Sequence, residues 1–200
     1  YFAITTAQLL LASASPRRSD LLEQIGVSFS VLAVDIDESR REDESPVDYV
    51  SRLAVEKAQA GFSRQEGQLP SLGADTIVVF DDQIFGKPRD QKQAEEMLLA
   101  LSGKVHSVYT AVAIDNGTDS AMAIAETRVG FRTISQSECL TYWQTGEPQG
   151  KAGAYAIQGR GGVFVEKLEG SYSAVVGLPL AETEQLLNKF SVPLWNTGTK

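Results

Sequence analysis

Cysteine and histidine are scarce in this chain, with one of each among 200 residues. The single Cys139 excludes an internal disulfide and a zinc site built from several cysteines. One free thiol fits a reducing compartment, and we interpret Cys139 as an inert, half-buried helical residue. The lone His106 stands beside a valine-rich strand, and we interpret it as a packing or surface residue rather than a member of a catalytic triad.

Long hydrophobic runs are also missing: none approaches the ~18–20 residues of a membrane span. The N-terminal residues Tyr1-Phe2-Ala3-Ile4 lack the basic region and the apolar core of a signal peptide. Because no initiating Met is present, we expect a trimmed or altered N-terminus, and we expect a loose tail after Pro193. These features predict a cytoplasmic protein.

Basic residues are outnumbered, since 18 Lys and Arg face 26 Asp and Glu and the formal net charge is -8. An acidic surface is a poor match for a nucleic acid polymer or an anionic membrane, so we expect neither as a partner. A small anionic ligand stays possible, because a local basic cleft can lie within an acidic protein. The length and an ordinary 42% hydrophobic content predict one large globular domain or two small lobes.

Short apolar runs alternate with amphipathic stretches, which predicts an α/β protein. Strands are expected over residues 9–12, 29–34, 72–80, 105–114 and 121–134, with the last two joined as a hairpin. Helices are expected to begin at Ser15, Ser45, Asp90 and Ser135, and a closing helix is lined by Leu180, Leu187 and Phe190.

Common nucleotide-binding motifs are missing from the glycine-containing segments. Gly86-Lys87 and Gly103-Lys104 lack the earlier glycine of a Walker A loop. The apolar residues after Gly159-Arg160-Gly161-Gly162 have the pattern of a strand rather than a helix, so a dinucleotide fingerprint is not predicted. The chain also contains no G-x-S-x-G elbow.

Ser13-Ala14-Ser15-Pro16-Arg17-Arg18 lies between a predicted strand and a predicted helix. The helix N-terminus, the Ser13 and Ser15 hydroxyls and the Arg17 and Arg18 guanidiniums make a plausible phosphate cradle. The alternative is a capped helix with two arginines in solvent. Two cations at the positive end of a helix dipole favour an anion nearby, but the residues alone leave both interpretations open.

A second candidate site is Asp75, which interrupts an otherwise apolar strand. A buried carboxylate must be paired, hydrogen-bonded or metal-bound, so we favour a functional role over a turn cap. The acidic segment 35–44 is by default a solvated loop, although Asp35-Ile36-Asp37-Glu38 could supply one metal ligand. Lys57 and Lys87 are each compatible with a surface position; together with two carboxylates they are typical of phosphoryl chemistry.

The motifs together resemble the Maf family of nucleoside triphosphate pyrophosphatases, from about Leu9 to Phe190. In chain order they are Ser13-Ala14-Ser15-Pro16-Arg17-Arg18, Asp35-Ile36-Asp37-Glu38, Arg52-Leu53-Ala54 with Lys57, Gly73-Ala74-Asp75-Thr76, Lys87-Pro88-Arg89-Asp90, Leu101-Ser102-Gly103, Lys151-Ala152-Gly153-Ala154-Tyr155, Ile157-Gln158-Gly159, Gly170-Ser171-Tyr172 and Val175-Val176-Gly177-Leu178-Pro179. The chain resembles the dTTP/UTP branch, which carries Pro-Arg-Arg where the 7-methyl-GTP branch typically has Pro-Trp-Arg.

The resemblance implies a long twisted mixed β-sheet flanked by helices, with two lobes and a central cleft. It implies a single Maf-like domain over residues 1–200, with a core at about 9–190, and a homodimer. The implied reaction is hydrolysis of dTTP, UTP and modified uridine or thymidine triphosphates to the monophosphate and pyrophosphate, which would keep modified nucleotides out of nucleic acids. A divalent cation, Mg²⁺ or Mn²⁺, is implied as cofactor.

The resemblance also implies residue roles. Asp75 matches the proton acceptor, and Arg17, Thr76 and Gln158 match positions tied to base specificity. Further active-site positions are matched by Glu38, Lys57 and Lys87, while Ser13, Ser15 and Arg18 complete the phosphate cradle. We expect Glu38 and Asp75 to hold the metal.

Gln158 leaves a question of selectivity open. Its carboxamide can match the acceptor–donor–acceptor edge of uracil or thymine, but a flipped amide suits cytosine as well. Selectivity therefore requires neighbours that fix the amide, and the sequence does not identify them. Two alternative functions also stay open: a nucleotide-sensing regulator of division and septum formation, and a purine-directed pyrophosphatase that cleaves ITP.

Overall fold

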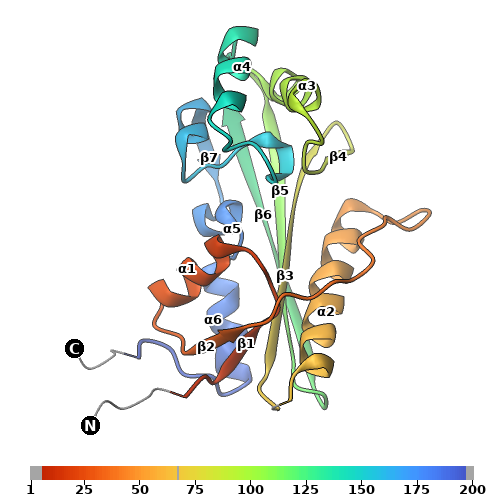
Figure 1. The fold of residues 1–200 in the computed structure, drawn as a ribbon, viewed down its shortest axis with the longest axis vertical. Helices are drawn as coiled ribbons and strands as arrows, with labels where there is room; N and C mark the ends of the chain where they lie inside the picture. The colour runs from red at the N-terminus through yellow and green to blue at the C-terminus, as the bar shows by residue number, and fades with distance from the viewer. Residues whose placement is uncertain (1–5, 67, 197–200) are drawn as a thin grey trace. The chain divides into compact units, whose positions relative to one another are not determined.

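The structure, a computed structural model, describes residues 6–66 and 68–196 of the chain. Its elements, in chain order, are β1 (Leu9–Leu11), α1 (Pro16–Gln24), β2 (Phe29–Val31), α2 (Pro46–Arg64), β3 (Ser71–Phe80), β4 (Gln83–Phe85), α3 (Gln91–Leu101), β5 (Val105–Asp115), β6 (Ser120–Phe131), α4 (Gln136–Gln144), η1 (Ala152–Ala154), η2 (Arg160–Phe164), β7 (Val165–Glu169), α5 (Tyr172–Val176) and α6 (Leu180–Lys189) (Figure 1).

All seven of these strands belong to one mixed sheet. The strand order is β2-β1-β3-β5-β6-β7, and β4 pairs with β3 outside this path. Strand β1 is parallel to both β2 and β3, whereas β3–β4 and β6–β7 are antiparallel. The parallel β1–β2 pair is connected through helix α1, as parallel neighbours require a crossover. The expected α/β fold with a mixed sheet flanked by helices is confirmed.

The chain divides into two compact units, which we describe separately. Among the described residues, the first unit contains 6–66, 68–75, 110–124 and 177–196, and the second contains 76–109 and 125–176. Strands β3, β5 and β6 each contribute residues to both units. The single-domain organisation over residues 1–200 stays a prediction.

In the first unit, α2 lies on one face of the strands and α1 and α6 lie on the other (Figure 1). The strands are therefore covered on both faces, which explains why β1 is a continuous run of leucines rather than an alternating pattern. Leu9, Leu11, Leu22, Leu53 and Leu72 are buried side chains of this core.

Side-chain hydrogen bonds cap three of the helices at the residues where they were predicted to begin. Ser45 accepts a hydrogen bond from the backbone N–H of Asp48, and Asp90 accepts one from Gln93. Ser135 and Glu138 form a complete capping box at the start of α4. Each of these caps depends only on residues three positions apart, so the sequence alone was enough to predict them.

Three strands end earlier than expected: β1 stops one residue early, at Leu11. Strand β2 ends at Val31 instead of residue 34, because its partner β1 has only three residues with which it can pair. Strand β6 ends at Phe131 instead of residue 134, and the N–H of Ile134 donates to the Ser102 hydroxyl instead of to a strand. Helix α5 was not predicted, since its five residues are too short for a periodic pattern.

The two scarce residue types lie in the core of the second unit. His106 is 2% exposed, its Nε2 lies 2.8 Å from the Tyr155 hydroxyl, and its ring makes an edge contact with Phe131. Burial lowers the pKa of His106 to about 4, so the ring is neutral. Burial raises the pKa of the Cys139 thiol to about 11. The packing role of His106 is confirmed, and Cys139 is helical as expected but is 2% exposed rather than half-buried.

The C-terminal segment is partly held in place. We expect a loose tail after Pro193, yet Trp195 and Asn196 donate backbone hydrogen bonds to the carbonyls of Ile25 and Gly26. Residues 1–5 and 197–200, about which the sequence makes similar predictions, lie outside the described residues. Within 6–66 and 68–196, no helix has the length and apolar character needed to cross a bilayer.

Candidate active site

The segment between β1 and α1 forms a compact polar turn. The Ser13 hydroxyl accepts a hydrogen bond from the backbone N–H of Ser15 and another from Nη1 of Arg18, both at 3.2 Å. Nε of Arg18 donates to the carbonyl oxygen of Gly177 at 2.8 Å, which ties the first turn of α1 to the segment that precedes α6. Ser15 occupies the N-cap position with Pro16 after it, but its side chain makes no capping bond.

The two arginines of this turn are not solvated side chains. Arg18 is 9% exposed and Arg17 is partly buried, and burial lowers the pKa of each. The charge of Asp75 and, more weakly, that of Glu38 favour the charged form of Arg18, whereas Arg17 opposes it. The alternative of a simple capped helix with two arginines in solvent is therefore wrong. One buried and one partly buried guanidinium close to a helix N-terminus match the electrostatics of an anion site.

A lysine bridges the two predicted acidic site residues. Nζ of Lys57 lies 2.6 Å from Oδ1 of Asp75 and 2.7 Å from Oε1 of Glu38. The side chains of Lys57 and Asp75 are 11% and 14% exposed, whereas that of Glu38 is 47% exposed. Three predicted site residues from α2, β3 and the acidic segment are thus brought together, with Asp75 and Lys57 largely shielded from water and Glu38 about half exposed.

Gly73 explains how Lys57 reaches Asp75. A Cβ atom at Gly73 would collide with the backbone oxygen of Ala54 and the backbone nitrogen of Ala58, so α2 packs directly on the backbone of β3. Residues 73 and 75 of a strand point to the same face. The close approach at Gly73 therefore brings the turn of α2 that carries Lys57 onto the face of β3 that carries Asp75.

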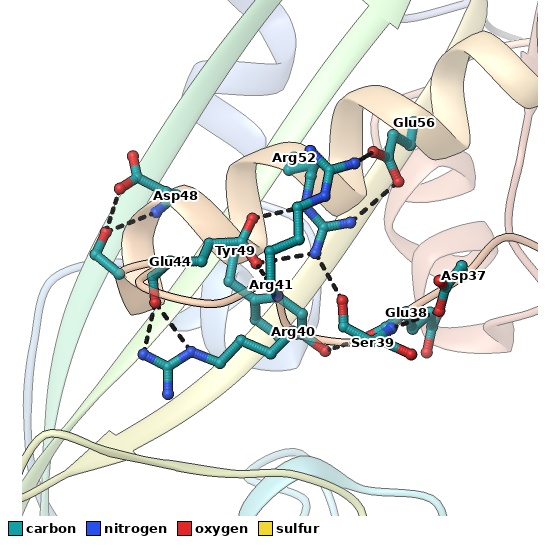
Figure 2. A network of polar contacts seen from close by, with 11 residues as sticks. Asp37, Glu38, Ser39, Arg40, Arg41, Glu44, Asp48, Tyr49, Arg52 and Glu56 are labelled. Carbon is teal, nitrogen blue, oxygen red and sulfur yellow. Dashed lines mark hydrogen bonds and ion pairs between the residues drawn. The ribbon is translucent and has the colours of Figure 1, made fainter.

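The acidic segment is held against α2 by a network of polar contacts (Figure 2). Nε and Nη2 of Arg52 donate to the two carboxylate oxygens of Glu44 at 2.6 and 2.9 Å, and Nη2 also donates to the carbonyl of Ser39. The Tyr49 hydroxyl donates to the backbone carbonyl of Glu38 at 2.8 Å. The segment is a largely exposed loop, as expected, but α2 holds its backbone at Glu38 and Ser39.

Charge neutralisation strengthens this network. The side-chain hydrogen bonds from Arg52 are the main reason that the pKa of Glu44 falls to about 2. Arg52 also pairs with Glu56 one turn later on α2, and Glu56 pairs with Arg41 of the acidic segment. Sequence reasoning assigned no role to Arg52, although the three- and four-residue spacing of Tyr49, Arg52 and Glu56 places them on one face of a helix.

The remaining predicted site residues belong to the second unit. Thr76 is a partly buried residue of β3, and Lys87 is exposed just after β4. The backbone before Lys87 is fixed, because the carbonyl of Gly86 accepts from the N–H of Gly153 at 3.2 Å. Gln158 is exposed between η1 and η2. The roles of these three residues stay predictions.

The carboxylates of the first unit fit a hard divalent cation. Mg²⁺ is commonly held by one or two carboxylates together with substrate phosphates, and Glu38 and Asp75 present oxygen atoms to a common point at Lys57 Nζ. In the part of the chain that the structure describes, no group of three or more His, Cys, Asp or Glu side chains could form an all-protein metal cage.

Known proteins match this chain over nearly its whole length. The family described as Maf-like protein matches residues 8–190. A dTTP/UTP pyrophosphatase of Saccharophagus degradans is 54% identical over 193 residues, covering 95% of this chain and 92% of the relative. A dTTP/UTP pyrophosphatase of Aliivibrio fischeri is 52% identical and covers 92% of this chain and 98% of its own.

Among solved structures, a nucleoside-triphosphatase / dITP/XTP pyrophosphatase of Mycobacterium abscessus is 18% identical, with a TM-score of 0.42 over 62% of this chain and 73% of its own. A likeness of that size adds nothing to the assignment. The family assignment rests on the family match and on the two relatives of more than 50% identity, because they cover the cradle, the Lys57 bridge and the Gln158 segment alike. This chain belongs to the Maf-like protein family.

Proposed function

We propose that this protein hydrolyses dTTP and UTP to the nucleoside monophosphate and pyrophosphate. The observation that carries the proposal is the bridge from Lys57 to Asp75 and Glu38, which lies within the electrostatic reach of the buried Arg18. This combination offers one candidate base and several cations in a partly buried site. Relatives that are 52–54% identical to the chain are named dTTP/UTP pyrophosphatases, which supports the choice of substrate.

Asp75 is the general base in the proposed mechanism. It accepts a proton from a water molecule whose oxygen attacks the α-phosphorus. The new P–O bond forms as the bond to the β-phosphate oxygen breaks, so pyrophosphate leaves with the bonding electron pair. A positioned general base is typically worth ~10²–10⁴ in rate. Lys57 holds Oδ1 of Asp75 at 2.6 Å and thereby fixes the direction of the carboxylate.

The cradle binds the charge that moves in this reaction. Arg17, Arg18 and the N-terminus of α1 offer donors to phosphate oxygens, with the hydroxyls of Ser13 and Ser15 beside them. Preorganised donors of this kind stabilise charge that develops on the leaving group. Lys87 is assigned to the phosphates and Thr76 and Gln158 to the base, as the sequence predicts.

Glu38 and Asp75 are the residues that would hold Mg²⁺ or Mn²⁺, because their oxygens are the hard ligands that these ions prefer. When bound, such an ion neutralises phosphate charge and lowers the pKa of a coordinated water. A homodimer is part of the proposal on the sequence resemblance alone, and a cytoplasmic location on the sequence features that predict it.

The test is an assay of the purified chain on dTTP, UTP, CTP, GTP and ITP with Mg²⁺ or Mn²⁺, in which pyrophosphate and orthophosphate are measured separately. We expect pyrophosphate from dTTP and UTP, and loss of turnover in Asp75→Asn. Asp119→Asn, at an exposed turn of the same unit, makes the same chemical change as a control. Orthophosphate as the direct product would overturn the reaction, and binding without turnover would favour the nucleotide-sensing alternative.

A further inference from the structure

Gln158 lies in a segment whose composition gives it little stiffness of its own. It is exposed, it separates the two short 3₁₀ helices η1 and η2, and Gly159, Gly161 and Gly162 follow it. Glycine loses more conformational freedom on folding than any other residue. The position of the Gln158 side chain therefore depends on groups elsewhere in the second unit that bind this backbone.

Glu147 and Tyr142 bind the backbone on both sides of Gln158. Oε1 of Glu147 accepts from the N–H of Arg160 at 2.9 Å, and Oε2 accepts from the N–H of Gly161 at 2.8 Å. The Tyr142 hydroxyl donates to Oε2 of Glu147 at 2.5 Å and accepts from the N–H of Ala156 at 3.2 Å. The bonds thus reach the second residue before Gln158 and the second and third residues after it.

The glycines beside Gln158 are explained by this contact rather than by backbone conformation. A Cβ atom at Gly159 would collide with the Glu147 carboxylate, and one at Gly161 would collide with the Tyr142 hydroxyl. Neither glycine has a positive φ, so side-chain-bearing residues could adopt both backbones. A side chain at Gly159 or Gly161 would therefore displace Glu147 or Tyr142 from these contacts.

Glu147 and Tyr142, which together we call the clamp, keep their hydrogen-bonding roles over a wide pH range. Burial, together with the bond to Glu147, raises the pKa of Tyr142, so its hydroxyl stays a donor. Burial opposes ionisation of Glu147, but the bonds from Tyr142, Arg160 and Gly161 outweigh it and lower the pKa of Glu147. An ionised carboxylate thus accepts three hydrogen bonds, which are stronger than neutral ones.

The clamp is anchored in the packed core of its unit. Tyr142 belongs to α4, is 5% exposed, and makes an edge contact with the Phe164 ring at 5.1 Å between centroids. A segment bound to a buried side chain of a helix moves less than one that is bound only to water. The clamp therefore transmits the rigidity of α4 to the backbone of Gln158.

We propose that Glu147 and Tyr142 are positioning residues that hold Gln158, and that they determine the discrimination between uracil or thymine and cytosine. The inference rests on the proposed hydrolysis of dTTP and UTP. Uracil and thymine present an N3–H donor where cytosine presents an acceptor, and a glutamine amide can satisfy either by flipping. A clamped backbone offers the amide to the base from one place, whereas a released backbone can adjust to both base edges.

The test uses two variants that keep the volume of the side chain: Glu147→Gln and Tyr142→Phe. Both are compared with the unmodified chain in kcat/KM and in equilibrium binding for UTP and CTP. We expect the UTP-to-CTP preference to fall by about tenfold in each variant, mainly through KM and Kd rather than kcat. The matched control is Glu95→Gln, which removes a carboxylate of α3 that contacts Gln136 and leaves the clamp intact.

Amide hydrogen exchange provides a readout that does not depend on nucleotide chemistry. We expect the N–H groups of Arg160 and Gly161 to exchange faster in Glu147→Gln, and that of Ala156 in Tyr142→Phe, with no change in Glu95→Gln. Tyr142→Phe retains the ring packed on Phe164, so it keeps the test valid if Glu147→Gln fails to fold.

The possible outcomes separate the two proposals. If the unmodified chain does not hydrolyse UTP, the proposed function fails, and the UTP-to-CTP binding ratio of the variants still decides on the clamp. An unchanged UTP-to-CTP preference in both variants, in turnover and in binding, would overturn the clamp whether or not the enzyme is active. A loss of preference equal to that of Glu95→Gln would overturn it as well.

Discussion

Nζ of Lys57 and Oδ1 of Asp75 are 2.6 Å apart, and this ion pair links helix α2 to strand β3. Because both side chains are largely shielded from water, neither charge is stabilised well without the other. Oε1 of Glu38 lies 2.7 Å from the same Nζ atom. Lys57 therefore also holds together two carboxylates that would otherwise repel each other. The pair thus has one role in stability and another in orienting the proposed base.

Lys57→Met removes this shared cation while retaining the aliphatic stem. We expect the free energy of unfolding to fall by about 1.5–3 kcal/mol, the usual value of hydrogen bonds to charged groups. Activity on dTTP should fall more than stability explains, because the Asp75 carboxylate loses its orientation. Urea unfolding and kcat/KM measure the two effects.

The control for this variant is a double-mutant cycle with Asp75→Asn. If Lys57 acts through Asp75, the double variant is less destabilised than the sum of the single ones, and its activity is no lower than that of Asp75→Asn alone. Strict additivity in both measurements would show that Lys57 and Asp75 act independently rather than as a pair.

Gly73→Ala tests whether the close contact of α2 and β3 is needed. The new methyl group would meet the backbone at Ala54 and Ala58, which cannot move as a flexible side chain can. Overpacking of this kind costs about 1–3 kcal/mol in unfolding free energy. Because the displaced helix carries Lys57, turnover of dTTP should be lost even in the folded fraction.

Gly86→Ala is the matched control for stability, since a Cβ at Gly86 would meet nothing within 4 Å and its φ is not positive. It should change the unfolding free energy by less than about 0.5 kcal/mol. Equal destabilisation by the two substitutions would contradict the importance of the contact at Gly73.

Arg52→Lys tests the network that holds the acidic segment. Lysine keeps the positive charge but cannot form the two-pronged bond that Arg52 makes to Glu44. We expect the backbone around Ser39 to loosen, so limited proteolysis within residues 35–44 should be faster and kcat/KM should fall by about tenfold, as one lost charged hydrogen bond allows.

Arg41→Lys makes the same change in the same network, at a side chain that is 66% exposed and pairs with Glu56 (Figure 2). An exposed ion pair contributes little, so this variant should resemble the unmodified chain. If Arg41→Lys and Arg52→Lys behave alike, the positioning role of Arg52 is wrong.

The sequence was sufficient where a structure depends on neighbours in the chain. The caps at Ser45 and Ser135 need only the residue three positions later, and both were predicted correctly. Asp75 was identified because one carboxylate in an apolar strand demands compensation, and the structure provides it through Lys57. The packing role of His106 followed in the same way from the apolar residues around it.

The sequence was insufficient where the decisive partner comes from another element. In the sequence Gly73 is recognisable only as part of a motif. The structure shows why glycine stands there, because the backbone of α2 at Ala54 and Ala58 leaves no room for a side chain. Glu147 was not identified at all: its partners are backbone N–H groups at residues 160 and 161, which every non-proline residue possesses. No pattern of side chains distinguishes such an acceptor before the chain is folded.

His106 makes the stability of the protein depend on pH. Its pKa is about 4 in the folded state against 6.5 in the absence of structure, so the unfolded chain binds a proton more readily. The contribution of neutral His106 to the free energy of unfolding is therefore fully present above pH 6.5, and it is lost as the pH falls from 6.5 toward 4. The full loss corresponds to about 3 kcal/mol, at ~1.4 kcal/mol for each pKa unit.

The measurement is the unfolding free energy in urea at several pH values between 7 and 5, where most carboxylates stay ionised. In His106→Phe the titrating ring is removed, so the decline over this range should disappear, although the Tyr155 hydroxyl loses its partner and lowers stability equally at every pH. A decline of the same slope in both proteins would mean that other groups, not His106, cause the acid sensitivity.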